Sequence, residues 1–246
     1  MAEVAIIGGS GLAQLEELRI DHREVVATPF GDPSAALIRG TFNGVEVIFI
    51  PRHGDPHTIP PHKVNYRANL WALKQLGIQQ VIGVAAVGGI TSKMPPQAVA
   101  IPDQIIDYTY NRPHTFFEEN LSQVTHIDFT EPYCEQLRQQ LISAAQQSGV
   151  DIVTGGTYGA TQGPRLESTM EIHRMEQDGC DLVGMTGMPE AALARELDLS
   201  YACCAVVANW AAGKGEGPIT MDEIHAHLNE GVEKVRLILS SAVASL

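Results

Sequence analysis

The sequence predicts a single α/β domain, residues 1–246, in which a mixed central β-sheet is flanked by helices. Short apolar runs alternate with segments of helical periodicity along the chain. The length of 246 residues, with 44% hydrophobic and 18% charged residues, is typical of a globular protein with one large core. No internal repeat, low-complexity tract or Gly/Ser linker divides the chain, so one domain is favoured.

Seven apolar runs are predicted as strands, because they are short and bounded by glycine, proline or polar residues. In chain order they span residues 4–7, 45–50, 81–87, 98–106, 151–158, 182–185 and 201–208.

Helices are predicted where apolar residues recur at helical spacing. These segments are 65–76, 132–148, 167–177 and 189–197, whereas 112–124 is expected to be a loop. A last helix begins after Thr220, whose spacing to Glu223 fits a capping box, and ends near Ala244. Its apolar stripe consists of Ile224, Leu228, Val232, Val235 and Leu239.

The net charge of −13 argues against nucleic acid or an anionic membrane as a partner. Residues 1–9 lack a signal-peptide pattern, and no apolar stretch is long enough to span a bilayer, so we expect a cytoplasmic protein. The four cysteines (Cys134, Cys180, Cys203 and Cys204) show no CxxC spacing, which disfavours a zinc site or a disulfide framework.

Residues 51–63 form a loop rich in cationic and imidazole groups. Pro56, Pro60 and Pro61 exclude an uninterrupted helix and Gly54 permits a tight bend, so the loop presents Arg52, His53 and His57. The arginine fork matches phosphate or carboxylate, which makes the loop a candidate anion site. A solvated basic loop is the alternative.

A glycine-rich turn, Gly8-Gly9-Ser10-Gly11, follows the first predicted strand. Its N–H groups and the Ser10 hydroxyl suit an anion. The third glycine of a dinucleotide-binding fingerprint is replaced by Gln14, and no Gly-Lys-Ser/Thr of a P-loop occurs. A plain tight turn therefore remains an alternative.

Three polar residues lie at predicted strand or helix ends. Glu167 is expected at the start of a helix, Thr186 follows a strand, and Asn209 ends the last strand. Individually these residues suit a first-turn acid, an N-cap and a turn former. Together they are candidates for binding one ligand.

The chain resembles the trimeric purine nucleoside phosphorylase and methylthioadenosine phosphorylase family over nearly its whole length. The family's order and spacing are matched by Gly8-Gly9-Ser10-Gly11, Arg52-His53-Gly54, His57-Thr58-Ile59, Lys63-Val64-Asn65-Tyr66, Ala68-Asn69, Gly163-Pro164, Met185-Thr186 and Pro189-Glu190.

This resemblance implies the nucleoside phosphorylase fold and a phosphate-dependent cleavage of the N-glycosidic bond, with phosphate as co-substrate and no metal or organic cofactor. It implies that Ser10, Arg52, His53 and Thr186 bind phosphate, and that the Met185 backbone faces the ribose. Asn209 and His53 would be the catalytic residues. His126 matches a histidine that reaches the neighbouring subunit's sugar site, which implies a homotrimer.

The base site is predicted to take a 6-oxopurine. Adenine-specific members carry acidic residues at the positions of Asn209 and Ala211, and a small hydroxyl residue at the position of Glu167. A carboxylate at Glu167 accepts the N1 proton of a 6-oxopurine and repels the N1 lone pair of adenine. Leu166 would pack on the purine face.

The sugar site resembles the methylthioadenosine branch, in which an apolar residue at the position of Met221 contacts the methylthio group. His225, one turn later, is a departure and could donate to a 5′-hydroxyl. We therefore predict phosphorolysis of a 5′-methylthio 6-oxopurine nucleoside, in purine salvage. The alternatives are an inosine/guanosine phosphorylase, an adenine-type methylthioadenosine phosphorylase, a dinucleotide-binding reductase and a non-catalytic nucleotide-binding module.

Overall fold

The computed structural model describes residues 3–9, 18–119 and 121–245. Its strands are β1 (Val4–Gly8), β2 (Leu18–Glu24), β3 (Leu37–Phe42), β4 (Val45–Pro51), β5 (Gln80–Gly89), β6 (Val99–Ile101), β7 (Gln104–Asp107), β8 (Val153–Thr154), β9 (Thr157–Ala160), β10 (Leu182–Gly184) and β11 (Ser200–Trp210). Its α-helices are α1 (Tyr66–Gln75), α2 (Glu135–Gln147), α3 (Thr169–Gln177), α4 (Gly187–Glu196) and α5 (Met221–Val243).

The described strands form one mixed sheet, whose main path runs β2-β3-β4-β1-β5-β10-β9-β7. At its centre β1 is parallel to β4 and β5, and β5 is parallel to β11. The carboxyl ends of these four strands therefore lie at one edge of the sheet, where ligands of open α/β sheets commonly bind.

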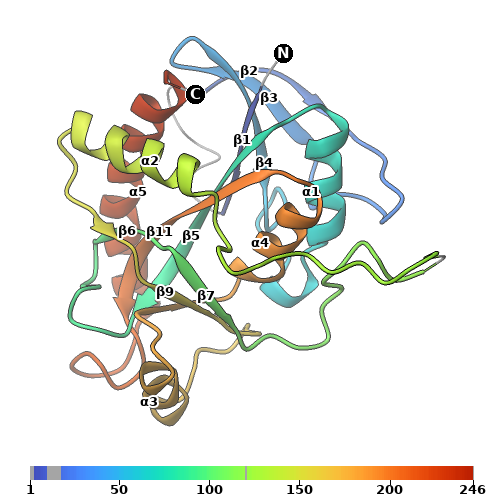
Figure 1. Cartoon of the computed structure of the whole chain (residues 1–246). Helices are drawn as coiled ribbons and strands as arrows, with labels where there is room; N and C mark the ends of the chain where they lie inside the picture. Colours follow the sequence, from blue (N-terminus) through green and yellow to red (C-terminus); the bar gives the residue numbers. More distant parts are fainter. Residues whose placement is uncertain (1–2, 10–17, 120, 246) are drawn as a thin grey trace.

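Helices cover both faces of this sheet (Figure 1). The side chains of alternate β1 residues are buried in two different hydrophobic cores. Ala5 and Ile7 belong to the core that includes α1 and α4. Val4 and Ile6 belong to the opposite core, which includes α2 and α5. This two-sided burial explains why the central strands are continuous apolar runs.

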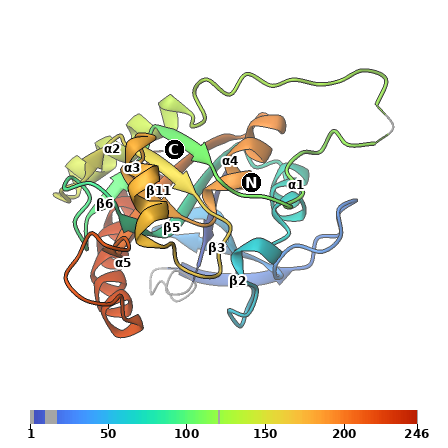
Figure 2. The ribbon, with the colours of Figure 1, turned by 90° about the horizontal axis from the view of Figure 1, so that it is seen from below.

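The segment between β7 and α2 is a long loop that extends away from the body of the protein (Figures 1 and 2). We call it the arm, residues 108–119 and 121–134. The arm begins at Tyr108, directly after β7, and the Tyr108 N–H is still bonded to the sheet, because it donates to Ala160 O at 2.8 Å. Leu121 and Val124 are exposed on it.

The predicted mixed sheet with flanking helices is confirmed, with corrections to several elements. The run 98–106 is divided between β6 and β7 at Pro102. The run 151–158 is divided between β8 and β9, because Gly155 and Gly156 adopt φ values of +91° and +112°. β2 and β3 were not predicted, because polar residues interrupt the apolar pattern of both strands, and in β2 most of these residues are exposed.

One boundary matters for the site. The predicted helix 167–177 begins at Thr169, with Ser168 as its N-cap and Glu171 completing a capping box. Glu167 therefore lies before the helix and not in its first turn. The last helix follows the prediction, since Thr220 caps it and Ala244 ends it.

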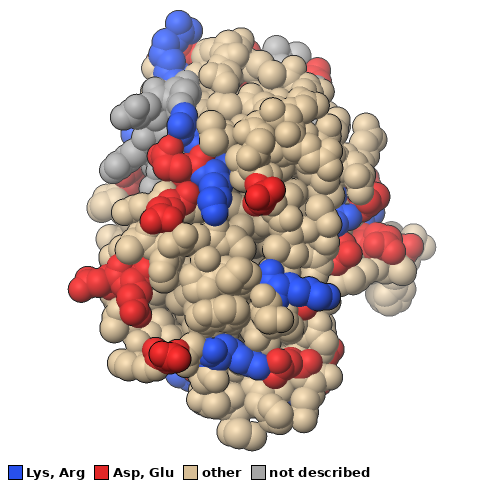
Figure 3. Space-filling model, turned by 90° about the vertical axis from the view of Figure 1, so that its left-hand side faces the viewer, with Lys and Arg blue, Asp and Glu red and all other residues tan. Residues whose placement is uncertain are grey.

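Surface charge is mixed on the face shown in Figure 3, where basic and acidic side chains are interspersed among uncharged ones. That face carries no continuous basic patch among its coloured residues, in keeping with the net charge of −13. Of the helices in the described residues, none combines the length and apolar character that a bilayer crossing demands.

Candidate functional site

Arg52 follows β4 at the carboxyl edge of the sheet and is 1% exposed. Its guanidinium pairs with Glu190 of α4 through Nε–Oε2 and Nη2–Oε1 distances of 2.7 Å each. Nη1 donates to Val84 O at 2.7 Å and Nη2 to Ile7 O at 3.2 Å. Four of its five N–H groups are therefore used inside the protein.

Tyr201 of β11 completes this buried cluster by donating to Glu190 Oε1 at 2.8 Å. Gly83 makes room for it, because a Cβ there would lie 2.2 Å from the Tyr201 hydroxyl. Burial on its own lowers the pKa of Arg52, but attraction to Glu190 outweighs it and raises that pKa. Arg52 is therefore a fixed buried cation below the edge of the sheet.

His53 is next to this cation and is held as a neutral imidazole. Its Nδ1 lies 2.8 Å from Ile59 O, and because a carbonyl only accepts, Nδ1 carries the hydrogen. Burial and then the charge of Arg52 lower the pKa of His53 to about 4. Nε2 is left with a free lone pair at neutral pH. His57 stacks on this ring, with a centroid distance of 4.5 Å.

Thr186 is buried between β10 and α4, at the N-cap position of that helix. The predicted N-cap position is therefore confirmed, although the Thr186 side chain makes no capping hydrogen bond. Met185 precedes it, and the Met185 carbonyl accepts from Arg112 Nη1 at 2.8 Å. Met185 also lies against Gly163, where a Cβ would be 2.3 Å from its sulfur.

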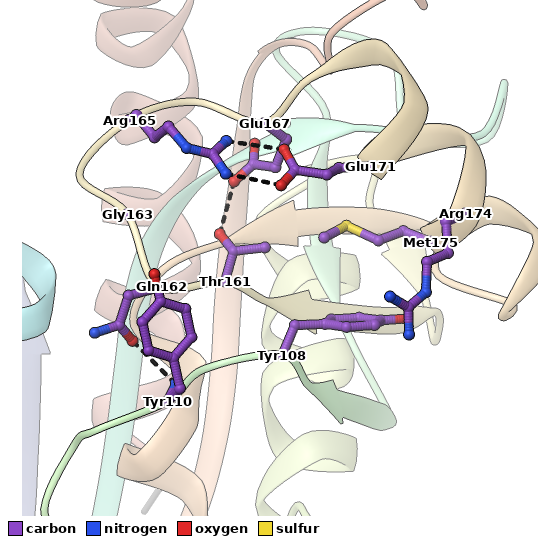
Figure 4. A pocket seen from close by; sticks show the side chains of 10 residues that line it. All are labelled: Tyr108, Tyr110, Thr161, Gln162, Gly163, Arg165, Glu167, Glu171, Arg174 and Met175. Atoms are coloured by element: carbon purple, nitrogen blue, oxygen red, sulfur yellow. Dashed lines mark hydrogen bonds and ion pairs between the residues drawn. The ribbon is translucent and has the colours of Figure 1, made fainter.

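Glu167 lies at the edge of a pocket of about 240 Å³ between the 161–168 loop, α3 and the base of the arm (Figure 4). Thr161 Oγ1 donates to Glu167 Oε1 at 2.6 Å. On the same side, Arg165 pairs with Glu171 through two bonds of 2.8 Å. The Glu167 carboxylate is thus held in a fixed direction. Leu166, beside it, is 45% exposed.

Asn209 occupies a β-bulge. The register of β11 against β5 shifts between Val207 and Asn209, so Ala208 is an extra residue that re-aims the next side chain. His227 Nδ1 lies 3.0 Å from Ala208 O and donates to it. Asn209 Nδ2 donates to Trp210 O at 2.7 Å, which leaves its carbonyl oxygen and one N–H available.

The remaining predicted residues are more scattered. Ala211 is buried just beyond the bulge, where its N–H donates to Gly89 O at 2.8 Å. Met221 is 60% exposed at the start of α5. His126 is exposed on the arm. Ser10 lies outside the described residues.

Glu190 was matched only as part of the Pro189-Glu190 motif, and no role was predicted for it or for Tyr201, Thr161 and Arg112. A signal existed for Glu190, because it shares a buried helix face with Leu193 and Ala194, three and four residues on. A charged side chain on an apolar stripe needs a buried partner. Arg112 carried no such signal, since it falls in a polar loop.

Among the residues that the structure describes, no three His, Cys, Asp or Glu side chains cluster so that they could hold a metal ion. That the chain works without a metal or an organic cofactor stays a prediction.

The sequence profile of the phosphorylase superfamily matches residues 3–244. A probable S-methyl-5′-thioinosine phosphorylase from Pseudomonas syringae pv. tomato is 52% identical over 245 residues, and the alignment covers 100% of both chains. A probable 6-oxopurine nucleoside phosphorylase from Moorella thermoacetica is 43% identical, covering 99% of this chain and 93% of its own.

Solved structures agree on the fold. Methylthioadenosine phosphorylase from Schistosoma mansoni, in complex with adenine, superposes with a TM-score of 0.94 at 35% identity. The match covers 100% of this chain and 92% of that protein. The predicted resemblance is therefore confirmed.

Proposed function

Because the chain belongs to the phosphorylase superfamily, we propose that it cleaves S-methyl-5′-thioinosine with phosphate, giving hypoxanthine and 5-methylthioribose 1-phosphate. The observation that carries the choice of base is the Glu167 carboxylate held by Thr161 Oγ1 at 2.6 Å. The relative named for this substrate, at 52% identity over the whole chain, supports the same choice.

The base site is proposed from Glu167, Leu166, Asn209 and Ala211. Glu167 accepts the N1 proton of a 6-oxopurine, while the methyl group of Ala211 offers nothing to a 6-amino group. Asn209 has an oxygen free to accept from a protonated N7 and one N–H free to donate to O6, since its other N–H is bonded to Trp210 O. Leu166 supplies an apolar surface for the purine.

The phosphate site is proposed at the carboxyl edge of the sheet, from Ser10, Arg52, His53 and Thr186. The buried Arg52 supplies positive charge but has a single N–H left for a ligand. The neutral His53 offers the Nε2 lone pair to a phosphate hydroxyl. A proton on phosphate thus has an acceptor within the protein.

These roles account for the reaction. A phosphate oxygen forms a bond to C1′ as the C1′–N9 bond breaks, and the bonding electron pair passes into the purine ring. The ring takes a proton at N7 from water, and Asn209 then accepts a hydrogen bond from N7–H. Interactions that strengthen as charge develops on the base lower the barrier, so Asn209 acts in the transition state.

The sugar is proposed to lie over Met185, with its 5′-methylthio group toward Met221. The thioether of Met221 is exposed and soft, which suits a sulfur-containing substituent. His225, also exposed on α5, would favour a 5′-hydroxyl instead. The ratio of kcat/KM for methylthioinosine to kcat/KM for inosine tests this choice directly.

We propose a homotrimer in which the arm of one subunit reaches the sugar site of the next. His126, Leu121 and Val124 are exposed on the arm, and apolar side chains projecting from a body favour burial in an interface. Light scattering should give three times the mass of the chain, and removing the arm should lower it.

The deciding experiment measures release of free base from methylthioinosine, inosine and methylthioadenosine at equal concentration, with and without phosphate. We expect phosphate-dependent release, fastest from methylthioinosine. Faster cleavage of methylthioadenosine would contradict the roles of Glu167 and Asn209. Faster cleavage of inosine would contradict the role of Met221, and no release would contradict the proposed function.

A further inference from the structure

Arg112, at the base of the arm, is 5% exposed and donates to six acceptors in three parts of the protein. We propose that it is a positioning residue, which fixes the 161–168 loop to the 185–188 segment and so sets the distance between the base and phosphate halves of the site. The inference rests on the proposed function for the identity of those halves.

On one side Arg112 holds the loop that leads to Glu167. Nη2 donates to Thr161 O at 3.0 Å and to Gln162 O at 2.8 Å. Nε donates to Gln162 Oε1 at 3.1 Å, and that oxygen also accepts from Tyr110 N at 3.2 Å. The loop is therefore fixed by its main chain and by a side chain.

On the other side Arg112 holds the segment that contains Thr186. Nη1 donates to Met185 O at 2.8 Å and to Met188 O at 2.6 Å. Met188 has φ −117° and ψ 139°, so its carbonyl is not aligned with the helical bonds of α4. Arg112 supplies that carbonyl with a donor. These two bonds flank Thr186.

The guanidinium of Arg112 also packs against Tyr66, the first residue of α1. Its carbon lies 5.6 Å from the centre of the Tyr66 ring, and Nη1 lies 3.4 Å from the Tyr66 hydroxyl. Tyr66 OH itself donates to Pro61 O at 2.9 Å, so Tyr66 connects Arg112 to the loop that carries His53. A planar cation stacked on a ring has few other orientations.

Arg112 does not bind substrate itself, because all five of its N–H groups are already used. Its effect passes through Thr161, whose carbonyl it holds and whose hydroxyl holds Glu167. Moving a catalytic group by about 1 Å costs a reaction on the order of 100-fold in rate. Lysine would keep the charge but has three donors on one atom and no planar fork.

Arg138 is a matched control. It is 6% exposed and also donates to main-chain carbonyls, through Nε to Pro102 O at 2.8 Å and Nη2 to Ile101 O at 3.3 Å. It joins α2 to the end of β6 and contacts neither the 161–168 loop nor the 185–188 segment. R138K therefore reports the loss of a buried arginine fork alone.

The test compares R112K with R138K in the full chain. A structural loss alone lowers the fraction of active enzyme, which lowers kcat and leaves KM unchanged. We expect R112K to raise the KM of both nucleoside and phosphate by about tenfold or more and R138K to leave both unchanged, with a fall in kcat/KM on the order of 100-fold for R112K. Wild-type KM values in R112K would overturn the inference.

Hydrogen exchange gives a second readout that needs no substrate. R112K should exchange faster than R138K, by about tenfold, in residues 161–168 and 185–188 and not in α2 or α5. Equal exchange in the two variants would overturn the positioning role. Wild-type enzyme inactive on every nucleoside would instead overturn the proposed function, and the exchange result would still decide the role of Arg112.

Discussion

Arg52 and Glu190 form a two-point ion pair in the interior, with Nε–Oε2 and Nη2–Oε1 distances of 2.7 Å and side chains that are 2% and 0% exposed. Arg52 follows β4 and Glu190 lies in α4, so the two residues are 138 positions apart in the chain. The pair converts a loop arginine into a fixed internal charge. Neutralising one partner leaves the other buried without a counter-charge.

Glu190→Gln should therefore lower the free energy of unfolding by about 3–5 kcal/mol, measured by urea denaturation. Glu233→Gln is the control, because Glu233 pairs with Arg236 at the surface and is 66% exposed. That change should cost about 0.2–1 kcal/mol. Equal losses in the two variants would show that burial adds nothing to the Arg52–Glu190 pair.

Thr161→Val removes the hydroxyl that donates to Glu167 at 2.6 Å and keeps the side-chain shape. A hydrogen bond to a charged group contributes about 1.5–3 kcal/mol, so kcat/KM for a 6-oxopurine nucleoside should fall about tenfold or more. Thr91→Val is matched, since Thr91 Oγ1 donates to Asp181 at 3.1 Å. That variant should lose stability with kcat/KM unchanged. A Thr161 variant with wild-type kcat/KM would contradict the role of this bond.

Glu167→Gln should weaken the discrimination between 6-oxopurine and adenine nucleosides. The carboxamide can turn its NH₂ toward the N1 lone pair of adenine, whereas the carboxylate repels that lone pair. We expect the ratio of kcat/KM for methylthioinosine to that for methylthioadenosine to fall by about 10²–10⁴. Glu171→Gln, which alters the neighbouring carboxylate, should leave the ratio unchanged. An unaltered ratio in the Glu167 variant would mean that another residue reads N1.

The pH dependence of stability should report His53. Its folded-state pKa is lowered from 6.5 to about 4, so between these values the unfolded chain binds a proton that the folded chain does not. Stability should therefore fall as the pH drops from about 6.5 toward 4, by at most about 1.4 kcal/mol per pH unit. The lowered pKa of His57 acts in the same direction.

Urea denaturation between pH 7 and 4.5 measures this slope. His53→Asn should flatten it, because the group that takes up the proton on unfolding is gone. His173→Asn, at an exposed position of α3, should keep the wild-type slope. Identical slopes in wild type and the His53 variant would assign the acid sensitivity to other groups.

The sequence by itself determined the fold class, the family and most elements, because apolar periodicity and helix caps are local. The run 45–50 became β4, the segment 65–76 became α1, and Thr220 caps α5 as predicted. The same local rules missed β2 and β3, which derive their stability from pairing with neighbours across the sheet edge. Asn43-Gly44, which joins β3 to β4, is a local hairpin signal that could have identified β3, whereas β2 is defined by its pairing with β3.

Only the tertiary structure decided how the charged residues are used. Arg52 and Arg112 lie in predicted loops and Glu190 in a predicted helix, yet all three are buried and satisfied by partners far along the chain. The physical reason is the cost of burying charge, which is offset by partners that only folding brings within reach. The motifs located the residues, and the fold made Arg52 an internal cation and Arg112 the link between two loops.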